Sequence, residues 1–227
     1  AYYHSQGYLD FDIFEYQIIN KNDITTLLIK INSGRKYHID NINFSGNYIF
    51  TDSTMKSKLL FKKGDIFNGL KFEFSNANLS NLYRDKGYLF SQVIPSLIPK
   101  SNNLLNINFD IIENSIVKVN EIIIKGHNTT EENVIRRDIE IFPGEIFNQS
   151  LMMESYRKLA MLNYFESITP NIRPIKDKNE VDIIFEVVEK SSGQLNFSAG
   201  YSGLYGFTGG GGFSFPNFLG KGQNMSF

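Results

Sequence analysis

The chain has 227 residues, a formal net charge of −1, three histidines and no cysteine. The near-neutral charge argues against a nucleic-acid partner, because nucleic-acid-binding proteins carry basic patches, and the lack of cysteine excludes disulfides and cysteine-ligated zinc. No apolar run reaches the roughly 18 residues of a membrane-spanning helix, and the opening residues AYYHSQGYL read as the middle of an element, so we expect the natural chain to begin upstream.

The first predicted element is a strand with the sequence DFDIFEYQI, residues 10–18. It contains no proline, so its row of N–H donors is complete, and an extended segment of another chain could add to its edge. The alternative is that its acidic side chains keep other chains away. The residues of this candidate substrate edge are Asp10, Phe11, Asp12, Ile13, Phe14, Glu15 and Tyr16.

A repeat of about eighty residues organises the chain. FSGN returns as KGHN, which places Gly46 against Gly126, and FKKGDIFNGL returns as FPGEIFNQSL, which places Gly64 against Gly144. QGYLD near the start likewise returns as KGYLF at residues 86–90. Because a fixed period marks a repeated structural unit, we predict the tail of one unit followed by two whole copies.

Each copy is predicted to fold as a strand, two helices and two strands. In the last copy the first strand is Val117–Ile124, and the capping box Thr129-x-x-Glu132 is expected to open the first helix. The connector F-x-x-G-[DE]-I-F-N leads to the second helix, which Asn68 or Asn148 is placed to cap.

Prolines predict the order of the strands. The two closing strands of the last copy are Ser167–Arg173 and Val181–Glu189. The segment Ser167–Pro174 carries two prolines four residues apart, as does its counterpart Val93–Pro99. Proline lacks an N–H and is tolerated on an edge strand. We therefore expect this fourth element at the edge, the fifth in the centre and the first on the far side, with both helices on one face of the sheet.

Charge disappears near the end of the chain: residues 193–218 contain no Lys, Arg, Asp or Glu. Apolar and small or polar residues alternate from Leu195 and again from Phe207, with a turn predicted at Gly203–Gly206. Such segments are typical of membrane barrels, in which apolar side chains face lipid. The alternative is two strands of an ordinary sheet or a glycine-rich tail. The apolar side of the first segment comprises Leu195, Phe197, Ala199 and Tyr201.

The tandem units, the run GHNTTEENVIRRD, the GEIFN connector and the charge-free stretch after Lys190 together resemble the BamA family of outer-membrane β-barrel assembly factors. The resemblance covers the whole chain and implies an α+β fold: tandem POTRA domains followed by the first antiparallel strands of a transmembrane β-barrel. It divides the chain into 1–34 (C-terminal part of a third POTRA domain), 35–114 (fourth), 115–190 (fifth) and 191–227 (first barrel strands). The last POTRA domain would enter the barrel across Val188–Gln194.

The resemblance also implies a function, which is assembly and insertion of β-barrel proteins into the bacterial outer membrane. The POTRA domains would lie in the periplasm and bind unfolded outer-membrane proteins and lipoproteins such as BamD, while the barrel would contact the lipid bilayer as an insertase. We expect no enzyme activity, no cofactor and no metal. One alternative is a related transporter that secretes a partner protein. Another is a POTRA-bearing division scaffold, which predicts one POTRA copy and no barrel strands.

Partner docking is the predicted role of Arg136 and Arg137, because the family binds BamD at this end of its fifth POTRA domain. The family often has an acidic residue where this chain has Pro143, so Glu140 or Glu145 would have to take its place. The alternative is a solvated helix face. By the same resemblance, Leu195–Tyr201 would be the first barrel strand and would form a seam with the last.

Other motifs predict no chemistry. His4, His38 and His127 are scattered and have no second ligand at metal spacing. The run GGGG at residues 209–212 lacks the Gly-Lys-Ser/Thr of a phosphate-binding loop and the helix that follows it.

Overall fold

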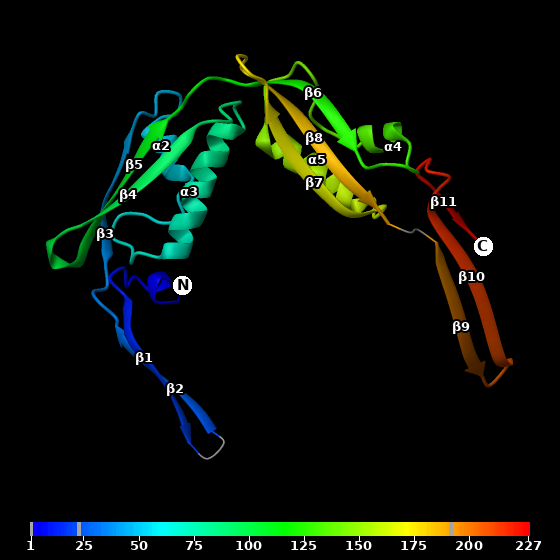
Figure 1. Ribbon diagram of the computed structural model, residues 1–227, viewed down its shortest axis with the longest axis horizontal. Helices are drawn as coiled ribbons and strands as arrows, with labels where there is room; N and C mark the ends of the chain where they lie inside the picture. The colour runs from blue at the N-terminus through cyan, green and yellow to red at the C-terminus, as the bar shows by residue number, and fades with distance from the viewer. Residues whose placement is uncertain (1, 22–23, 191–192) are drawn as a thin grey trace. The chain divides into compact units, whose positions relative to one another are not determined.

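The computed structural model describes residues 2–21, 24–190 and 193–227 and separates into two compact units (Figure 1). The first unit comprises Ala1–Arg84 and Phe90–Ser115, and the second comprises Asp85–Leu89 and Ile116–Phe227. No helix in the described ranges is long and apolar enough to cross a membrane.

The first unit opens with the short helix α1 (Tyr2–Ser5) and an antiparallel hairpin of β1 (Asp12–Lys21) and β2 (Ile24–Asn32). The predicted strand 10–18 is therefore wrong at its start. Asp10 lies before β1 and accepts hydrogen bonds from Tyr37 Oη at 2.8 Å and Arg35 Nε at 3.2 Å. Phe11 also precedes β1 and stacks on the Tyr3 ring, with 4.2 Å between the centroids.

The main sheet of the first unit contains β3 (His38–Ser45), β5 (Leu104–Ile112) and β4 (Gln92–Pro99), in the order β3-β5-β4. β3 is parallel to β5 and β4 is antiparallel to it. Helices α2 (Asp52–Ser57) and α3 (Gly69–Arg84) lie on one side of this sheet (Figure 1). The order predicted from the prolines is confirmed, because the proline-bearing strand β4 is an edge and β5 is central.

The main sheet of the second unit repeats this topology. Its order is β6-β8-β7, with β6 parallel and β7 antiparallel to the central strand β8. The side chains of Val181, Ile183, Phe185 and Val187 on β8 are buried in the core under the helices. The elements of this unit are β6 (Lys118–Lys125), α4 (Glu132–Arg136), α5 (Gln149–Met161), β7 (Phe165–Pro174) and β8 (Glu180–Glu189).

The repeated connector G-[DE]-I-F pairs with the outer edge of the first strand in each unit. The amide of Gly64 donates to the Ile39 carbonyl at 2.7 Å, and the Ile39 amide donates to the Asp65 carbonyl at 2.9 Å. In the second unit Gly144, Val119 and Glu145 make the same two bonds, at 2.7 and 2.9 Å. The connector glycines have φ of +90° and +87°, a conformation that glycine adopts at little cost. The motif thus covers the first half of an exposed strand edge.

The helix starts confirm one sequence prediction and overturn another. Asn148 caps α5, its side chain accepting from the Leu151 amide at 2.9 Å, and Asn68 accepts likewise from the Lys71 amide at 3.0 Å. The predicted capping box Thr129-x-x-Glu132 is wrong, because α4 begins at Glu132 and its N-cap, Glu131, makes no side-chain capping bond.

The charge-free segment forms an antiparallel sheet in the order β11-β10-β9 (Figure 1). Its register places Leu195, Phe197, Ala199 and Tyr201 opposite Phe213, Gly211, Gly209 and Phe207, which puts the four residues on one face of the hairpin. The turn predicted at Gly203–Gly206 is confirmed, since β9 ends at Ser202 and β10 begins at Gly206. The predicted boundary at 190/191 adjoins residues 191–192, which lie outside the described residues. Over the described residues 193–227 this sheet is open and forms no closed barrel. The strands are β9 (Gln194–Ser202), β10 (Gly206–Phe218) and β11 (Gln223–Ser226).

Candidate docking site around helix α4

The turn between β10 and β11 packs against the start of helix α4. The buried side chain of Asn217 donates to Thr130 Oγ1 at 2.8 Å and accepts from the Gly222 amide at 2.8 Å. The Glu131 amide donates to the Gly220 carbonyl at 2.9 Å. An unpaired buried amide would cost free energy, so these bonds fix the turn against the helix start.

Glycine is required in this turn by conformation and by space. Gly220 has φ of +74°, and a Cβ atom there would lie 1.9 Å from the Thr129 carbonyl oxygen. Asn217 and Leu219 also have positive φ, at 58° and 53°. A chain that adopts this conformation at several positions is held by its surroundings, which here are the residues before α4.

The carboxylate of Glu189, at the end of β8, binds three consecutive amides of the same loop. Asn128, Thr129 and Thr130 donate to it at 3.0, 2.9 and 2.6 Å. Burial disfavours the charged carboxylate, but the hydrogen bonds from Thr130, Thr129 and Asn128 outweigh burial and lower the pKa of Glu189 from 4.5 to about 2. The loop before α4 is therefore bound by Glu189 from one side and by the β10–β11 turn from the other.

Arg136 is exposed, but its guanidinium is already engaged within the second unit. Its guanidinium bonds the Glu132 carboxylate and donates from Nη2 to the Ile122 carbonyl on β6 at 3.3 Å. The hydrogen bond from Arg136 also lowers the pKa of Glu132 below its ordinary value. Arg137 turns to a different neighbour: its Nε lies 3.5 Å from Asp138 Oδ2, and its Nη2 lies beside Gly222.

The two predicted acidic residues also have separate structural partners. Glu140 pairs with Lys158 on α5, which raises the pKa of Lys158. The Glu145 carboxylate accepts from the Phe142 amide at 3.3 Å and so orders the connector. Arg136, Arg137, Glu140 and Glu145 thus contact β6, the turn, α5 and the connector, and they do not form one cluster.

A hollow of about 410 Å³ lies where the turn meets the second unit's repeat. Its lining combines the aromatic rings of Tyr164 and Phe215 with the charged side chains of Glu189 and Lys190. Among the described residues no group of three or more His, Cys, Asp or Glu is placed to hold a metal. The hollow is lined by Thr129, Thr130, Tyr164, Glu189, Lys190, Gly193, Phe215 and Asn217.

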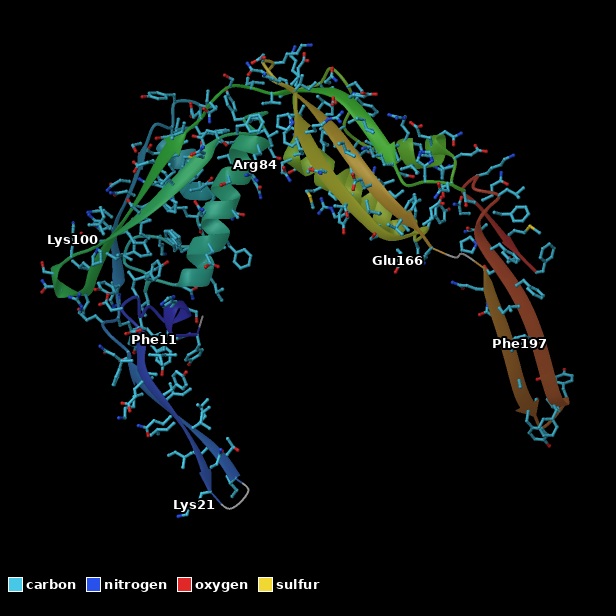
Figure 2. The ribbon with its side chains drawn as sticks, in the orientation of Figure 1. Phe11, Lys21, Arg84, Lys100, Glu166 and Phe197 are labelled. Carbon is cyan, nitrogen blue, oxygen red and sulfur yellow. The ribbon has the colours of Figure 1, made fainter. Side chains whose placement is uncertain are left out.

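Of the other predicted site residues, Asp12–Tyr16 lie on β1 and Leu195–Tyr201 lie on β9, where Figure 2 labels Phe197. On β1, Glu15 pairs with Lys30 at 2.6 Å and Tyr16 is exposed. The register shifts between Ile13 and Glu15, and the side chains of Ile13 and Phe14 are both exposed. On β9 the side chains of Leu195, Phe197 and Tyr201 are exposed at 61%, 84% and 71%.

Sequence reasoning missed Glu189, Thr130 and Asn217. Asn217 and Thr130 are 87 residues apart, and no local pattern connects them. A usable signal was the clustering of turn residues in FPNFLGKG, which marks a tight loop.

Two comparisons place this architecture among known proteins. The POTRA family, described as surface antigen variable number repeat, matches residues 37–114 and 117–190, more than half of the chain. The chain therefore belongs to the POTRA family. Among its relatives, the outer membrane protein assembly factor BamA of Nitratidesulfovibrio vulgaris is 27% identical over 232 residues, covering 100% of this chain and 29% of the relative.

Solved BamA structures share the fold. A crystal structure of Haemophilus influenzae BamA POTRA3-5 has a TM-score of 0.73 at 19% identity, covering 83% of this chain and 76% of that one. Haemophilus ducreyi BamA lacking POTRA domains 1-3 has a TM-score of 0.75 at 24% identity, covering 84% and 36%. The chain spans less than a third of the length of the curated relatives it matches first, at 28%, 29% and 30%.

Proposed function

We propose that this chain is part of a factor that assembles β-barrel proteins in the bacterial outer membrane, with its POTRA domains in the periplasm. The proposal rests on the order of the structural units along the chain. Two POTRA repeats are followed by a charge-free antiparallel sheet, whose turn is bonded to the last repeat through Asn217 and Gly220. Relatives named for outer membrane protein assembly match the chain from end to end.

The mechanism proposed is non-enzymatic. Exposed strand edges would offer main-chain hydrogen bonds to unfolded outer-membrane proteins, without nucleotide or cofactor. The test is reconstitution of the full-length protein that contains these residues in phospholipid vesicles, with a urea-unfolded outer-membrane protein added. Faster folding than in empty vesicles, read as a gel-mobility shift, is the expected result. If the reconstituted protein is folded and inserted in the vesicles but the substrate folds at the same rate as in empty vesicles, the proposal is contradicted.

The domain division proposed is 1–34, 35–114, 115–190 and 191–227, with β9 to β11 as the first barrel strands. In support, the apolar side of the β9–β10 hairpin is exposed and uncharged, with Phe197 at 84% and Phe207 at 90%. Lipid would cover such a face, whereas water exposes it to aggregation.

A truncation tests the barrel assignment. A chain that ends at Lys190 is expected to stay monomeric, while the 227-residue chain associates or needs detergent. The double substitution Phe197→Lys and Phe207→Lys is the matched control and should restore a monomer. Equal solubility of the truncated and complete chains at the same concentration would rule against membrane strands.

A partner lipoprotein of the BamD type is proposed to dock at α4, near Arg137. Arg137 is proposed as the contact rather than Arg136, because Arg136 is engaged with Glu132 and Ile122. Reversing Arg137 to Glu should weaken lipoprotein binding in a titration, whereas reversing the exposed Arg157 on α5 should not. If the two variants bind the lipoprotein with equal affinity, Arg137 is not part of the docking site.

The β1 edge remains a proposed site for substrate strands, over residues 12–16 now that Asp10 and Phe11 lie outside the strand. Unfolded barrel peptides are expected to crosslink to β1 in preference to the proline-bearing edges of β4 and β7, and crosslinks confined to β4 or β7 would contradict this.

A further inference from the structure

The outer edge of β3 is only half covered. The connector occupies Tyr37 and Ile39, whose main-chain groups bond to Phe67, Gly64 and Asp65. Ile39 pairs with Leu105 on β5, the register shifts between Ile39 and Asn41, and Ile42 then pairs with Ile107. Ile42 therefore has the same orientation relative to β5 as Ile39. Because main-chain groups alternate in direction along a strand, the N–H and C=O of Ile42 and Phe44 point to the open edge.

The second unit supplies a matched case in which this edge is closed. Ile122 is eighty positions after Ile42, and its carbonyl accepts from Arg136 Nη2 at 3.3 Å, which also confirms the outward direction of that carbonyl. The residue eighty positions before Arg136 is Lys56, which among the described residues makes no bond to the Ile42 carbonyl. The edge that an arginine closes in one repeat is therefore open in the other.

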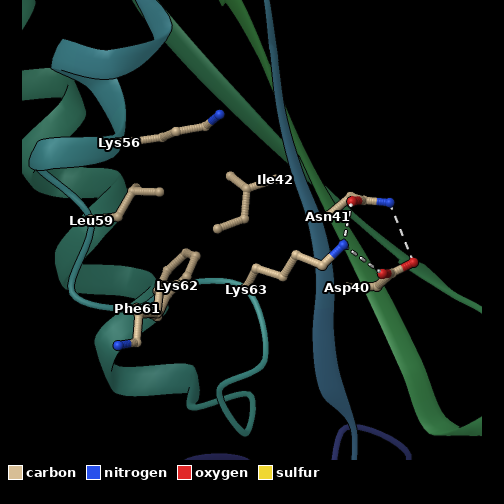
Figure 3. A pocket seen from close by; sticks show the side chains of 8 residues that line it. All are labelled: Asp40, Asn41, Ile42, Lys56, Leu59, Phe61, Lys62 and Lys63. Atoms are coloured by element: carbon tan, nitrogen blue, oxygen red, sulfur yellow. Dashed lines mark hydrogen bonds and ion pairs between the residues drawn. The ribbon is translucent and has the colours of Figure 1, made fainter.

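The side chains next to this edge are also more deeply buried in the second unit than in the first. In the second unit Ile122 and Ile139 are each 3% exposed. Their first-unit counterparts Ile42 and Leu59 are only partly buried. A hollow of about 280 Å³ lies beside them, between β3 and the α2 side of the unit, and Leu59, Phe61 and Ile42 form its apolar wall (Figure 3).

The rim of this hollow is positively charged. Lys56, Lys62 and Lys63 line it together with a single carboxylate, Asp40. Asp40 is already paired with Lys63 at 3.4 Å and with Lys100 at 3.1 Å, so it does not neutralise Lys56 or Lys62. In Figure 3 Lys56 stands over the hollow with no interaction drawn to the other lining residues.

We propose that the open half of β3 binds an extended segment of a separate protein chain, which adds as a strand along residues 41–45. An apolar side chain of that segment fills the hollow against Leu59 and Phe61, and acidic side chains on either side of it pair with Lys56 and Lys62. Main-chain pairing supplies affinity and the hollow supplies selectivity, as in other sites where a strand is added to a sheet edge.

The probe is a fluorescein-labelled nine-residue peptide in which leucine alternates with aspartate, titrated by anisotropy into the 227-residue chain kept monomeric in detergent. Saturable binding is expected, with slower hydrogen exchange at the amides of Ile42 and Phe44. A peptide with lysine in place of aspartate should bind at least tenfold more weakly. Protection that maps to β1, β4 or β7 instead, or equal affinity of the two peptides, would overturn the proposal.

A graft of the second unit's closing pair tests the mechanism. Asp52→Glu with Lys56→Arg places in the first unit the glutamate and arginine that close the Ile122 edge, while it keeps the net charge. Binding should fall at least tenfold, and the matched control Lys71→Arg on α3 should bind as the unmodified chain does. Undiminished binding by the graft would overturn the proposal.

The reciprocal variant keeps the test decisive if the graft perturbs folding. Arg136→Ala opens the Ile122 edge, and peptide-dependent protection should then appear at Ile122 and Ile124. Its absence in a folded variant would count against edge pairing. Self-association of the chain that competes with the peptide would instead identify a second copy as the occupant and would also overturn the proposal.

Discussion

The two POTRA repeats share their interior and differ at their surface. Both bury a serine of the second helix that accepts from the loop before the connector, Ser75 from the Leu60 amide and Ser155 from the Glu140 amide, each at 2.8 Å. Both place a glycine where a side chain would strike the central strand. The shared residues are those that the sheet and helices require for packing.

The differences lie at the loop before the first helix and at the edge beside it. In the second unit that loop is bonded to Glu189 and to the β10–β11 turn, and Arg136 closes the edge. In the first unit Thr51 caps α2 through its own side chain and the edge is half open. A repeat can therefore be specialised by a few surface substitutions while its core is kept, and substitutions at matched positions test this view.

The largest effect is expected at the shared glycines. Gly46→Ala and Gly126→Ala would place Cβ 2.2 and 2.0 Å from the carbonyl oxygens of Ile111 and Val187, in addition to the strain of positive φ. Each should destabilise its own repeat by about 3 kcal/mol or more. Gly64→Ala and Gly144→Ala meet no atom within 4 Å and should cost only about 1 kcal/mol.

Hydrogen exchange measured separately in each repeat checks this prediction. Equal losses at the packed and the open glycines would show that backbone strain alone sets the cost.

The next effect is expected at the carboxylate that binds the loop before α4. Glu189→Gln should loosen residues 128–130, at a cost of about 2 kcal/mol for charged hydrogen bonds weakened in a partly buried site. Glu113→Gln is the first-unit comparison and should cost less, because Glu113 binds the Ile49 amide and Tyr83 Oη instead of three amides.

The pH dependence of the same loop has a defined sign. The pKa of Glu189 is lowered in the folded state to about 2, so its stabilising contribution is complete above pH 4.5 and is lost as the pH falls toward 2. Exchange of the Thr129 and Thr130 amides should accelerate in this window relative to Glu189→Gln, which lacks the titration. A pH profile identical in both proteins would contradict the assignment.

A smaller difference is expected at the helix caps. Thr51→Ala removes the side chain that accepts from the Thr54 amide at 3.3 Å and should cost about 1 kcal/mol. Glu131→Ala at the matched N-cap should change stability by less than about 0.5 kcal/mol, since that side chain makes no capping bond. Chemical denaturation of the two variants measures the difference, and equal losses would remove this distinction between the repeats.

The smallest effect is expected at Glu140, a half-exposed residue paired with Lys158. Glu140→Leu gives the second unit the residue that the first has at position 60, and ion pairs open to water contribute little to stability. Its denaturation midpoint should shift little and the shift should shrink with added salt. A loss that salt leaves unchanged would point to a packing role for this residue.

Local chemistry explains what the sequence could predict. The repeat was visible because glycines with positive φ and the connector recur at one spacing, and the strand order followed from prolines that cannot donate. The apolar side of β9 followed from alternation alone, since strand side chains point to opposite faces.

Long-range contacts explain what it could not. Thr129 and Glu132 fit a capping box, yet the loop amides bind Glu189, about sixty positions away. Arg136 and Arg137 are adjacent in sequence, yet one turns to β6 and the other to the turn. Asp10 fits a strand pattern, but Tyr37 and Arg35 hold it before β1.

The bond between Asn217 and Thr130 also has a consequence for the order of folding. It closes a loop of 87 residues, and such distant contacts form after local ones because their closure costs more entropy. Glu189 at the end of β8 binds the loop that carries Thr130 and Glu131, the residues to which the turn is bonded. We therefore expect the turn to pack against the loop only after the repeat has folded. During synthesis, which starts at the N-terminus, the POTRA core would fold before the charge-free strands pack against it.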